Sequence, residues 1–326
     1  MKFANRILLS IFLAALVGSS ALACKVPVFR YALERWNPDK YEVLIIHNEP
    51  LDATSQSLVD QLKSSKRRAT TNYEIQSVAA DELRDKRLVA LWKTRTEASK
   101  PLMVVLYPKT AMEVPDRILF AETLNETHVE LLLQSPVREQ LALRLSSGQT
   151  AVWIFVPCGI EAKDTAALKV LNQCIAVNRE RLAVPTAEEL EIQPATLVTN
   201  KIPLRIEFSV VKLDRKDSRE AFLLSSLLKS EADLDATEPM AFPVFGRGRV
   251  LYALVGDGIM AETTDSACQF MAGPCSCQVK EQNPGFDLLI EEDWDSAVAG
   301  SVISTAIADP TTEPQLLAIP PGRGSK

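Results

Sequence analysis

The run "YEVLIIH" (Tyr41–His47) is short, apolar and rich in β-branched residues, which predicts a buried strand. A helical pattern follows it at Asp52–Leu62, and the run "NYEIQSV" (Asn72–Val78) predicts a second strand. Strands that alternate with helices indicate a layered α/β fold, with a mainly parallel sheet and helices on both faces. The alternation continues through predicted helices at Ala79–Trp92, Val129–Leu145 and Asp164–Leu182 and predicted strands at Pro101–Pro108 and Thr150–Gly159.

A stretch that mixes prolines, threonines and acids, residues 184–202, interrupts this rhythm and predicts a linker. It would separate an α/β domain at residues 24–183 from a second α/β sub-domain at residues 203–308. Residues 309–326 are rich in proline and small residues, which is typical of a disordered tail. In the second sub-domain we expect strands at Pro203–Leu213 and Arg249–Gly256 and helices at Ser218–Leu228 and Thr263–Ala272.

Two further segments of the second sub-domain, "CSCQVKE" (275–281) and "FDLLIEE" (286–292), flank the turn sequence Gln282-Asn283-Pro284-Gly285. This arrangement predicts a β-hairpin that carries cysteines.

An amphipathic helix is predicted near the start of the first domain. Phe29, Leu33 and Trp36 fall at helical spacing, while Arg30 and Glu34 form an i,i+4 pair that we expect on the other side.

The first 23 residues have the pattern of a secretory signal peptide: a positive start, the apolar run Ile7–Val17, and small residues ending in Ala21-Leu22-Ala23. We therefore expect export to a periplasmic or other extracytoplasmic location, with Cys24 as the first mature residue. Two alternatives remain for Cys24. It is either lipidated, which would tether the protein to a membrane, or part of a disulfide.

The composition argues against nucleic-acid binding. The chain of 326 residues has a formal net charge of −6 and no large basic block, whereas neutralising phosphates requires a positive surface.

Cys268, Cys275 and Cys277 form the densest group of chemically reactive residues. In an oxidising compartment their most common role is a structural disulfide. Three thiolates can also bind a soft metal such as Zn²⁺ or Cu⁺, and a C-x-C pair can exchange disulfides. All three alternatives remain open from the sequence.

Cys158 follows a predicted buried strand and precedes a predicted helix, the context in which the thioredoxin fold places its reactive cysteine. Thioredoxin-like units are therefore compatible with the pattern. A C-x-x-C pair is absent because position 161 is Glu161. The alternatives for Cys158 are a small buried residue or a disulfide with Cys24 or Cys174.

Other motifs are weaker. Gly256–Glu262 fits a dinucleotide-binding turn, but two glycines in an ordinary turn fit equally well. Arg247 and Arg249 lie in a glycine loop and could bind an anion. Residues 291–295, "EEDWD", match no calcium loop. The sequence contains no serine-hydrolase, zinc-protease or P-loop motif, and we expect no cofactor.

The sequences "CKVPVFRYALERW", "FVPCG", "FGRGRVLYALVGDGI" and "CSCQVKEQNPGFDLL" span most of the mature chain. They resemble those of an uncharacterised family of exported bacterial proteins, a resemblance that implies export but no known activity. We therefore predict a non-catalytic cell-envelope protein that binds a partner or serves an assembly. The alternative is a thiol–disulfide or soft-metal protein that uses Cys268, Cys275 and Cys277.

Overall fold

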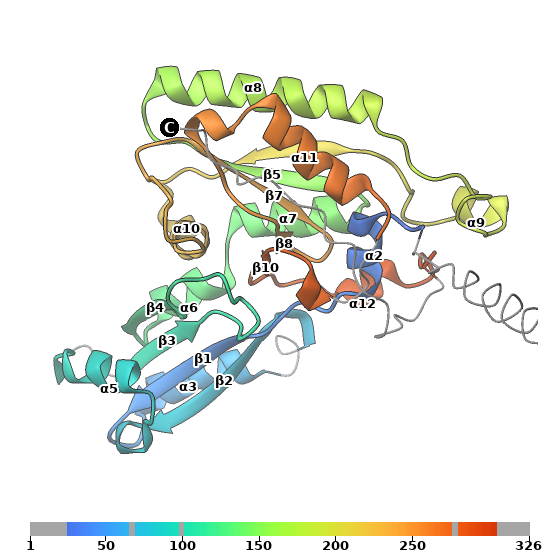
Figure 1. Cartoon of the computed structure of the whole chain (residues 1–326). Coiled ribbons are helices and arrows are strands. Elements are labelled where there is room, and N and C mark those ends of the chain that lie inside the picture. The colour runs from blue at the N-terminus through green and yellow to red at the C-terminus, as the bar shows by residue number, and fades with distance from the viewer. Residues whose placement is uncertain (1–24, 65–68, 98–100, 276–279, 305–326) are drawn as a thin grey trace, which may run out of the picture.

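The computed structural model describes residues 25–64, 69–97, 101–275 and 280–304 (Figure 1). They form two β-sheets with helices packed on both faces of each, so the predicted α/β class is confirmed. The sheets are mixed rather than mainly parallel, because each has one parallel strand pair and its other pairs are antiparallel. Among the described residues, no helix combines the length and apolar character needed to cross a membrane.

The first sheet has the strand order β2-β1-β3-β4. Strands β1 (Tyr41–His47) and β2 (Tyr73–Ala79) run parallel and are connected through helix α3 (Ala53–Lys63). Strands β3 (Leu102–Leu106) and β4 (Ile118–Thr123) follow as an antiparallel pair joined by a loop. A parallel connection requires a crossover, whereas neighbouring antiparallel strands need only a loop.

The second sheet repeats this connectivity. Strands β5 (Ala151–Val156) and β6 (Phe208–Lys212) are parallel, and β7 (Met240–Phe245) lies antiparallel on the other side of β5. Strand β8 (Arg249–Val250) then pairs with β7, so β6-β5-β7-β8 corresponds to β2-β1-β3-β4. Two short strands, β9 (Leu254–Val255) and β10 (Phe286–Asp287), complete the sheet.

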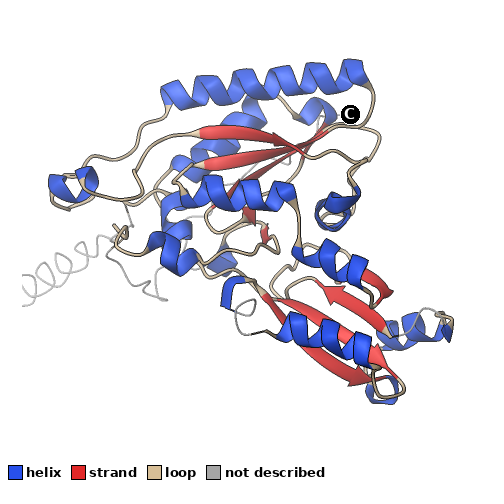
Figure 2. Cartoon of the chain, turned by 180° about the vertical axis from the view of Figure 1, so that it is seen from behind, coloured by secondary structure: helices blue, strands red, loops and turns tan. Residues whose placement is uncertain are grey.

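The helices cover the sheets in layers (Figures 1 and 2). Along β5, Val152 and Ile154 face a core between the two sheets, whereas Trp153 and Phe155 face an outer core under α8 and α11. This alternation follows from the two-residue period of a strand.

The remaining helices are α2 (Val28–Arg35), α5 (Lys86–Lys93), α6 (Glu126–Leu133), α7 (Pro136–Ser146), α8 (Glu161–Arg181), α9 (Pro194–Val198), α10 (Ala221–Leu228), α11 (Ala261–Ala272) and α12 (Trp294–Val298). The 3₁₀ turns are η1 (Ala80–Glu82), η3 (Ser218–Glu220), η4 (Gly256–Gly258) and η5 (Lys280–Gln282).

The division between the two sheets differs from the predicted division at residues 184–202. Strand β5 and helix α8 precede that stretch, yet they belong to the second sheet because β5 pairs with both β6 and β7. Helix α2 also packs on the second sheet, next to β7 and α11. The first unit therefore comprises β1 to α6, and the chain enters the second unit before residue 151.

The predicted cysteine-bearing hairpin is not formed by the described residues. Residues 280–282 form η5, and β10 pairs with β8 instead. The N–H of Cys275 donates to the carbonyl of Val26 (3.0 Å), and Pro274 lies opposite Pro27 in an isolated bridge. The end of α11 is therefore paired with the segment before α2. Cys277 lies outside the described residues.

The predicted strand at Arg249–Gly256 is divided into β8 and β9. Both strands pair with β7, but at its two ends, and Pro243 lies between those ends. Because proline has no N–H to donate, the ladder is interrupted there. The carbonyl of Pro243 still accepts the N–H of Leu251 (3.0 Å).

Candidate functional site

A groove of about 950 Å³ lies at one end of the second sheet, between α8, η4 and the segment before β7. Three other cavities measure only about 100, 270 and 290 Å³. Ligand sites commonly occupy about 300–1,000 Å³, so the groove, the largest of these four cavities among the described residues, is large enough for a substantial ligand.

The groove has an apolar floor and an acidic rim. Short aliphatic side chains of α8 and apolar residues on either side of η4 form the floor. None of the lining residues is aromatic. The floor comprises Ala166, Ala167, Val170, Val255, Ile259 and Met260, and the charged residues of the rim are Asp233, Asp235, Glu238, Asp257 and Lys163. The four carboxylates outnumber the single lysine, so the groove is complementary to positively charged side chains.

Gly256 makes the sharp turn from β9 into η4. Its φ is +53°, a conformation that glycine adopts without strain, and its N–H donates to the carbonyl of Pro239 (2.9 Å). The Thr263 hydroxyl donates to the carbonyl of Gly258 (2.6 Å), which fixes the start of α11. These contacts hold the wall of the groove in place.

Cys158 lies beside the groove, between β5 and α8. The backbone N–H groups of Cys158 and Gly159 donate to the two carboxylate oxygens of Asp164, at 2.7 and 2.9 Å. The thiol is half-buried. Lys163 forms an ion pair with Glu238 across the groove. That bond raises the pKa of Lys163, and the charges of Glu238 and the nearby Cys158 contribute less.

The predicted alternative of a disulfide between Cys158 and Cys174 conflicts with the length of α8. Cys158 precedes the helix, whereas Cys174 lies in its fourth turn. At 1.5 Å of rise per residue, about 20 Å separate the two ends of that segment, and a disulfide requires Cα atoms within about 7 Å. Cys24 lies outside the described residues.

Of the three clustered cysteines, the structure describes Cys268 and Cys275, and both are buried. Cys268 lies on α11 and is fully buried, and burial raises the pKa of its thiol well above the usual value. Cys275 is also fully buried. The thiolate is the nucleophile and the metal ligand, so a raised pKa works against both roles. Within the described part of the chain, no three His, Cys, Asp or Glu residues are arranged to hold a metal.

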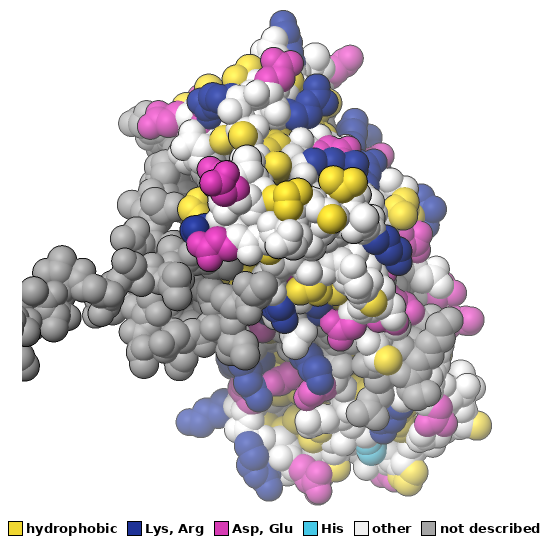
Figure 3. All heavy atoms as spheres, turned by 90° about the vertical axis from the view of Figure 1, so that its right-hand side faces the viewer, with side chains coloured by type: hydrophobic (Ala, Val, Ile, Leu, Met, Phe, Trp, Pro, Cys, Tyr) yellow, Lys and Arg dark blue, Asp and Glu magenta, His cyan; other side chains and the backbone are white. Residues whose placement is uncertain are grey.

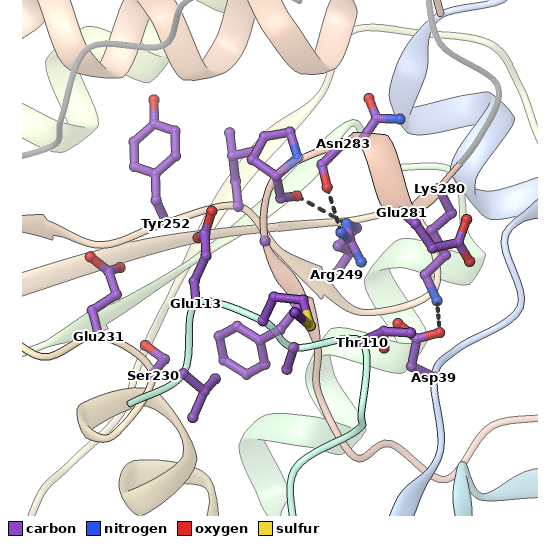
Figure 4. Close-up of a pocket in the computed structure, with 17 residues that line it drawn as sticks. Asp39, Thr110, Glu113, Ser230, Glu231, Arg249, Tyr252, Lys280, Glu281 and Asn283 are labelled. Carbon is purple, nitrogen blue, oxygen red and sulfur yellow. Dashed lines mark hydrogen bonds and ion pairs between the residues drawn. The ribbon is translucent and has the colours of Figure 1, made fainter. Parts of the chain in front are cut away.

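The cavity of about 100 Å³ shown in Figure 4 lies where the two units meet. Its buried cations, Arg249 and Lys280, are held by protein groups. Arg249 donates to the carbonyls of Asn283 (2.7 Å) and Pro284 (3.0 Å) and pairs with Asp287 (3.2 Å).

Lys280 pairs with Asp39 (2.8 Å) and Asp287 and donates to the carbonyl of Asn37 (2.6 Å). Because Asp39 and Asp287 already neutralise the two cations, the cavity is suited to stabilising the junction rather than to binding an anion.

Arg247, the other candidate anion ligand, is also occupied. Its guanidinium donates to the carbonyl of Leu33 (2.8 Å) and pairs with Asp295 (2.8 Å). The acidic run that includes Asp295 does not converge on one point: Asp293 caps α12 by accepting the N–H of Ser296 (3.0 Å). The turn at Gly256–Glu262 forms a wall of the groove.

The groove residues that sequence reasoning missed are Lys163, Asp233, Asp235, Glu238 and Pro239. They come from two segments about 70 positions apart, and no local motif marks them. Of the sequence motifs considered, only the glycine turn that begins at Gly256 contributes residues to the groove.

Charges on the rest of the surface are mixed. Lys and Arg side chains are interspersed with Asp and Glu on the face shown in Figure 3, without a continuous field of one sign. Comparison of the chain with protein-family models, with curated proteins and with solved structures gives no match.

Proposed function

We propose that this protein is exported to the cell envelope, where it binds an extended segment of a partner polypeptide in the groove beside Cys158. The observation that carries this proposal is the groove itself, with its apolar floor and four-carboxylate rim. The partner segment would present aliphatic side chains to the floor and Lys or Arg side chains to the rim. The role is non-catalytic binding or assembly.

The shape of the floor favours a polypeptide over a rigid small molecule. Pockets for small molecules are usually lined with aromatic side chains and a few convergent polar groups. Here Ala166, Ala167 and Val170 leave the surface of α8 shallow, so a peptide backbone can approach closely. Aliphatic contacts would contribute affinity, and the acidic rim would select basic segments and speed their association.

The topology also supports a binding role. Each unit has the order strand, helix, strand, helix, two antiparallel strands, helix, which is the connectivity of the thioredoxin fold. Cys158 follows the first strand of the second unit and precedes its first helix. The following residues are Gly159, Ile160 and Glu161, so the site lacks the second cysteine of a C-x-x-C pair. A fold alone does not establish an activity, and we assign none to Cys158.

Export rests on the leader, residues 1–23, which lies outside the described residues. The intact mass of protein matured in a bacterial host tests it. A chain that starts at Cys24 supports export, and added acyl mass would also make the protein a membrane-tethered lipoprotein. A retained leader would contradict export by cleavage.

Peptide binding is tested by fluorescence polarisation with a labelled decapeptide of alternating Lys and Val. We expect binding that weakens as salt rises, and no binding of the matching Glu–Val peptide. Ala166→Trp should obstruct the floor of the groove and reduce affinity at least tenfold. Ala176→Trp is the matched control, because Ala176 is an exposed residue of the same helix outside the groove.

Equal affinity for the two peptides would contradict the proposal. An equal loss of affinity in Ala166→Trp and Ala176→Trp would also contradict it. So would a second copy of the chain occupying the groove, which sedimentation equilibrium would reveal as a dimer lost on Ala166→Trp.

The alternative of a thiol–disulfide or soft-metal protein using Cys268, Cys275 and Cys277 stays a prediction. A fast-reacting thiol among these three in the folded protein would favour that alternative.

A further inference from the structure

The groove beside Cys158 and one segment of this chain have matching chemistry. Residues 309–326, predicted from the sequence to be a disordered tail, lie outside the described residues. Within this stretch, residues 314–326 have the sequence "PQLLAIPPGRGSK", in which aliphatic side chains precede two basic ones and no acid occurs. The aliphatic residues are Leu316, Leu317 and Ile319, and the basic residues are Arg323 and Lys326.

The composition of residues 314–326 fits both parts of the groove. Their aliphatic side chains match the floor formed by Ala166, Ala167 and Val170, and burying apolar surface there would stabilise the contact. Their two cations match the rim, where four carboxylates outnumber a single lysine. Proline-rich segments favour an extended backbone, and this segment contains three prolines.

A continuous series of contacts leads from the groove to the last described residue. Met260 lines the groove and immediately precedes α11. At the other end of α11, the carbonyl of Gly273 accepts the N–H of Val28 (2.9 Å), the first residue of α2. At the end of α2, the Arg35 guanidinium donates to the hydroxyl of Ser304 (2.7 Å).

The chain after Ser304 is long enough to cover this route. Helix α11 has 12 residues and α2 has 8, so together they are about 30 Å long at a rise of ~1.5 Å per residue. Residues 305–315 can extend over about 36 Å, and residues 305–326 over about 70 Å. Leu316 and the residues after it therefore have the reach to enter the groove.

The other stretches outside the described residues do not offer this chemistry. Residues 65–68, 98–100 and 276–279 are short and are attached to described residues at both ends, so none of them can lie along the groove. The leader, residues 1–23, is expected to be removed on export. Residues 314–326 are therefore the segment of the chain that fits.

We infer that residues 314–326 occupy the groove of their own chain, and that a partner segment must displace them. This inference rests on the proposed function, because it concerns the regulation of the same groove. Attachment to one chain gives the segment an effective concentration of about millimolar, so even a weak contact competes with a partner. The groove would then admit only partner segments that bind more tightly or are abundant.

Carbodiimide cross-linking of the full mature chain tests where the segment lies, because this reagent joins an amine directly to a carboxylate that touches it. We expect an amide between Lys326 and a carboxylate of the rim. Trypsin should then release residues 324–326 joined to residues 230–247, which carry Asp233, Asp235 and Glu238. The cross-linked protein should keep the mass of one chain.

Two tryptophan variants make the cross-link specific. Ala166→Trp obstructs the floor and should remove most of the linked peptide. Ala176→Trp, at an exposed position of the same helix outside the groove, should leave its yield unchanged. Equal yields in the two variants, or links that join two chains, would overturn the inference.

The labelled Lys–Val peptide measures the competition. A segment that fills the groove about 90% of the time lowers the apparent affinity of a competing peptide about tenfold. The double substitution Arg323→Glu with Lys326→Glu should therefore raise the affinity for the peptide about tenfold.

The matched control for this charge reversal is the double substitution Lys86→Glu with Lys93→Glu. It changes the net charge by the same amount, at exposed positions of α5 in the first unit. A gain in affinity in the Arg323→Glu, Lys326→Glu variant that is no larger than in this control would overturn the inference.

The two experiments separate this inference from the proposed function. A cross-link to the rim in a protein of which no variant binds the peptide would leave the docked segment standing and remove partner binding. Peptide binding that is equal with and without the charge reversal, in a protein that forms no cross-link, would do the reverse.

Discussion

Arg30 and Glu34 carry opposite charges one helical turn apart, and both side chains are 1% exposed. The side of α2 that carries this pair is buried as well, because the segment at residues 301–304 covers it. The Arg30 guanidinium donates to the carbonyl of Ile202 (2.9 Å). The Glu34 carboxylate accepts the N–H groups of Ile303 (3.0 Å) and Ser304 (2.8 Å).

The substitution Glu34→Ala should lower the free energy of unfolding by about 3–5 kcal/mol, because it leaves the Arg30 cation buried without its partner. It also removes the acceptors of two backbone N–H groups. Urea denaturation provides the measurement. Lys25→Ala is the control, since Lys25 and Glu191 form an exposed ion pair that should contribute nothing measurable. Similar losses for the two variants would show that burial of the pair does not matter.

At the level of single residues, the sequence predicts the position of a residue when that position depends on its neighbours along the chain. The place of Cys158 between a strand and a helix follows from the apolar run before it and the helical pattern after it. The burial of Glu34 does not, because its partners are about 270 positions away. Glu238 likewise becomes a groove residue only when the fold brings it to Lys163, 75 positions earlier.

At the level of elements, most helices and the strands with continuous apolar runs were predicted, whereas β4 and β7 were not. The helix predicted at Ala79–Trp92 is divided into η1 and α5. The run Tyr41–His47 is a strand with the expected bounds. The helical stretch predicted at Val129–Leu145 is divided into α6 and α7, and Pro136 is the first residue of α7. Strand β7 was missed because its sequence, "MAFPVF", contains a proline that argues against a central strand. The neighbouring gap between β8 and β9 accommodates that proline.

Helix α3 offers a prediction on pH. The Asp52 side chain caps its first turn by accepting the N–H of Ser55 (2.7 Å), and this hydrogen bond lowers the pKa of Asp52. A lowered folded-state pKa means that the carboxylate stabilises the protein above the unfolded-state pKa of about 3.9. That stabilisation is lost as the pH falls through the folded-state pKa.

Asparagine caps helices about as well as aspartate but does not titrate. Asp52→Asn should therefore keep the stability of the wild type near pH 7 and reduce the loss of stability as the pH falls below the unfolded-state pKa of about 3.9. Thermal unfolding at a series of pH values gives the comparison, with Asp52→Ala as the variant that loses the cap at every pH. An unchanged pH dependence in Asp52→Asn would show that the cap does not contribute to acid unfolding.

At the level of the whole molecule, the repeated connectivity of the two sheets could not be predicted from residue patterns. Strand pairing depends on contacts between distant segments, and the two units share the order of their elements without sharing recognisable residues. The core that the two sheets share could not be predicted from the sequence either. Val43 of the first sheet and Val152 of the second belong to one buried cluster, and the Tyr107 hydroxyl of the first unit donates to the carbonyl of Ser226 in the second (2.7 Å).

A continuous core should make the two units unfold together, and Asp287 provides the means to test this. Its carboxylate, 3% exposed, pairs with Arg249 and Lys280 and accepts the N–H of Asp39 (2.7 Å), just before β1. Asp287→Ala leaves two buried cations without this partner and should cost about 3–5 kcal/mol.

Hydrogen exchange followed by mass spectrometry can report β1 and β5 separately. If the units unfold as one, Asp287→Ala should lower the opening free energies of both strands by the same amount. Asp295→Ala is the control, because Asp295 is 84% exposed although it also pairs with a buried arginine. Loss of protection in β1 while β5 stays protected would mean that the first unit opens independently. The second unit would then hold the groove without support from the first.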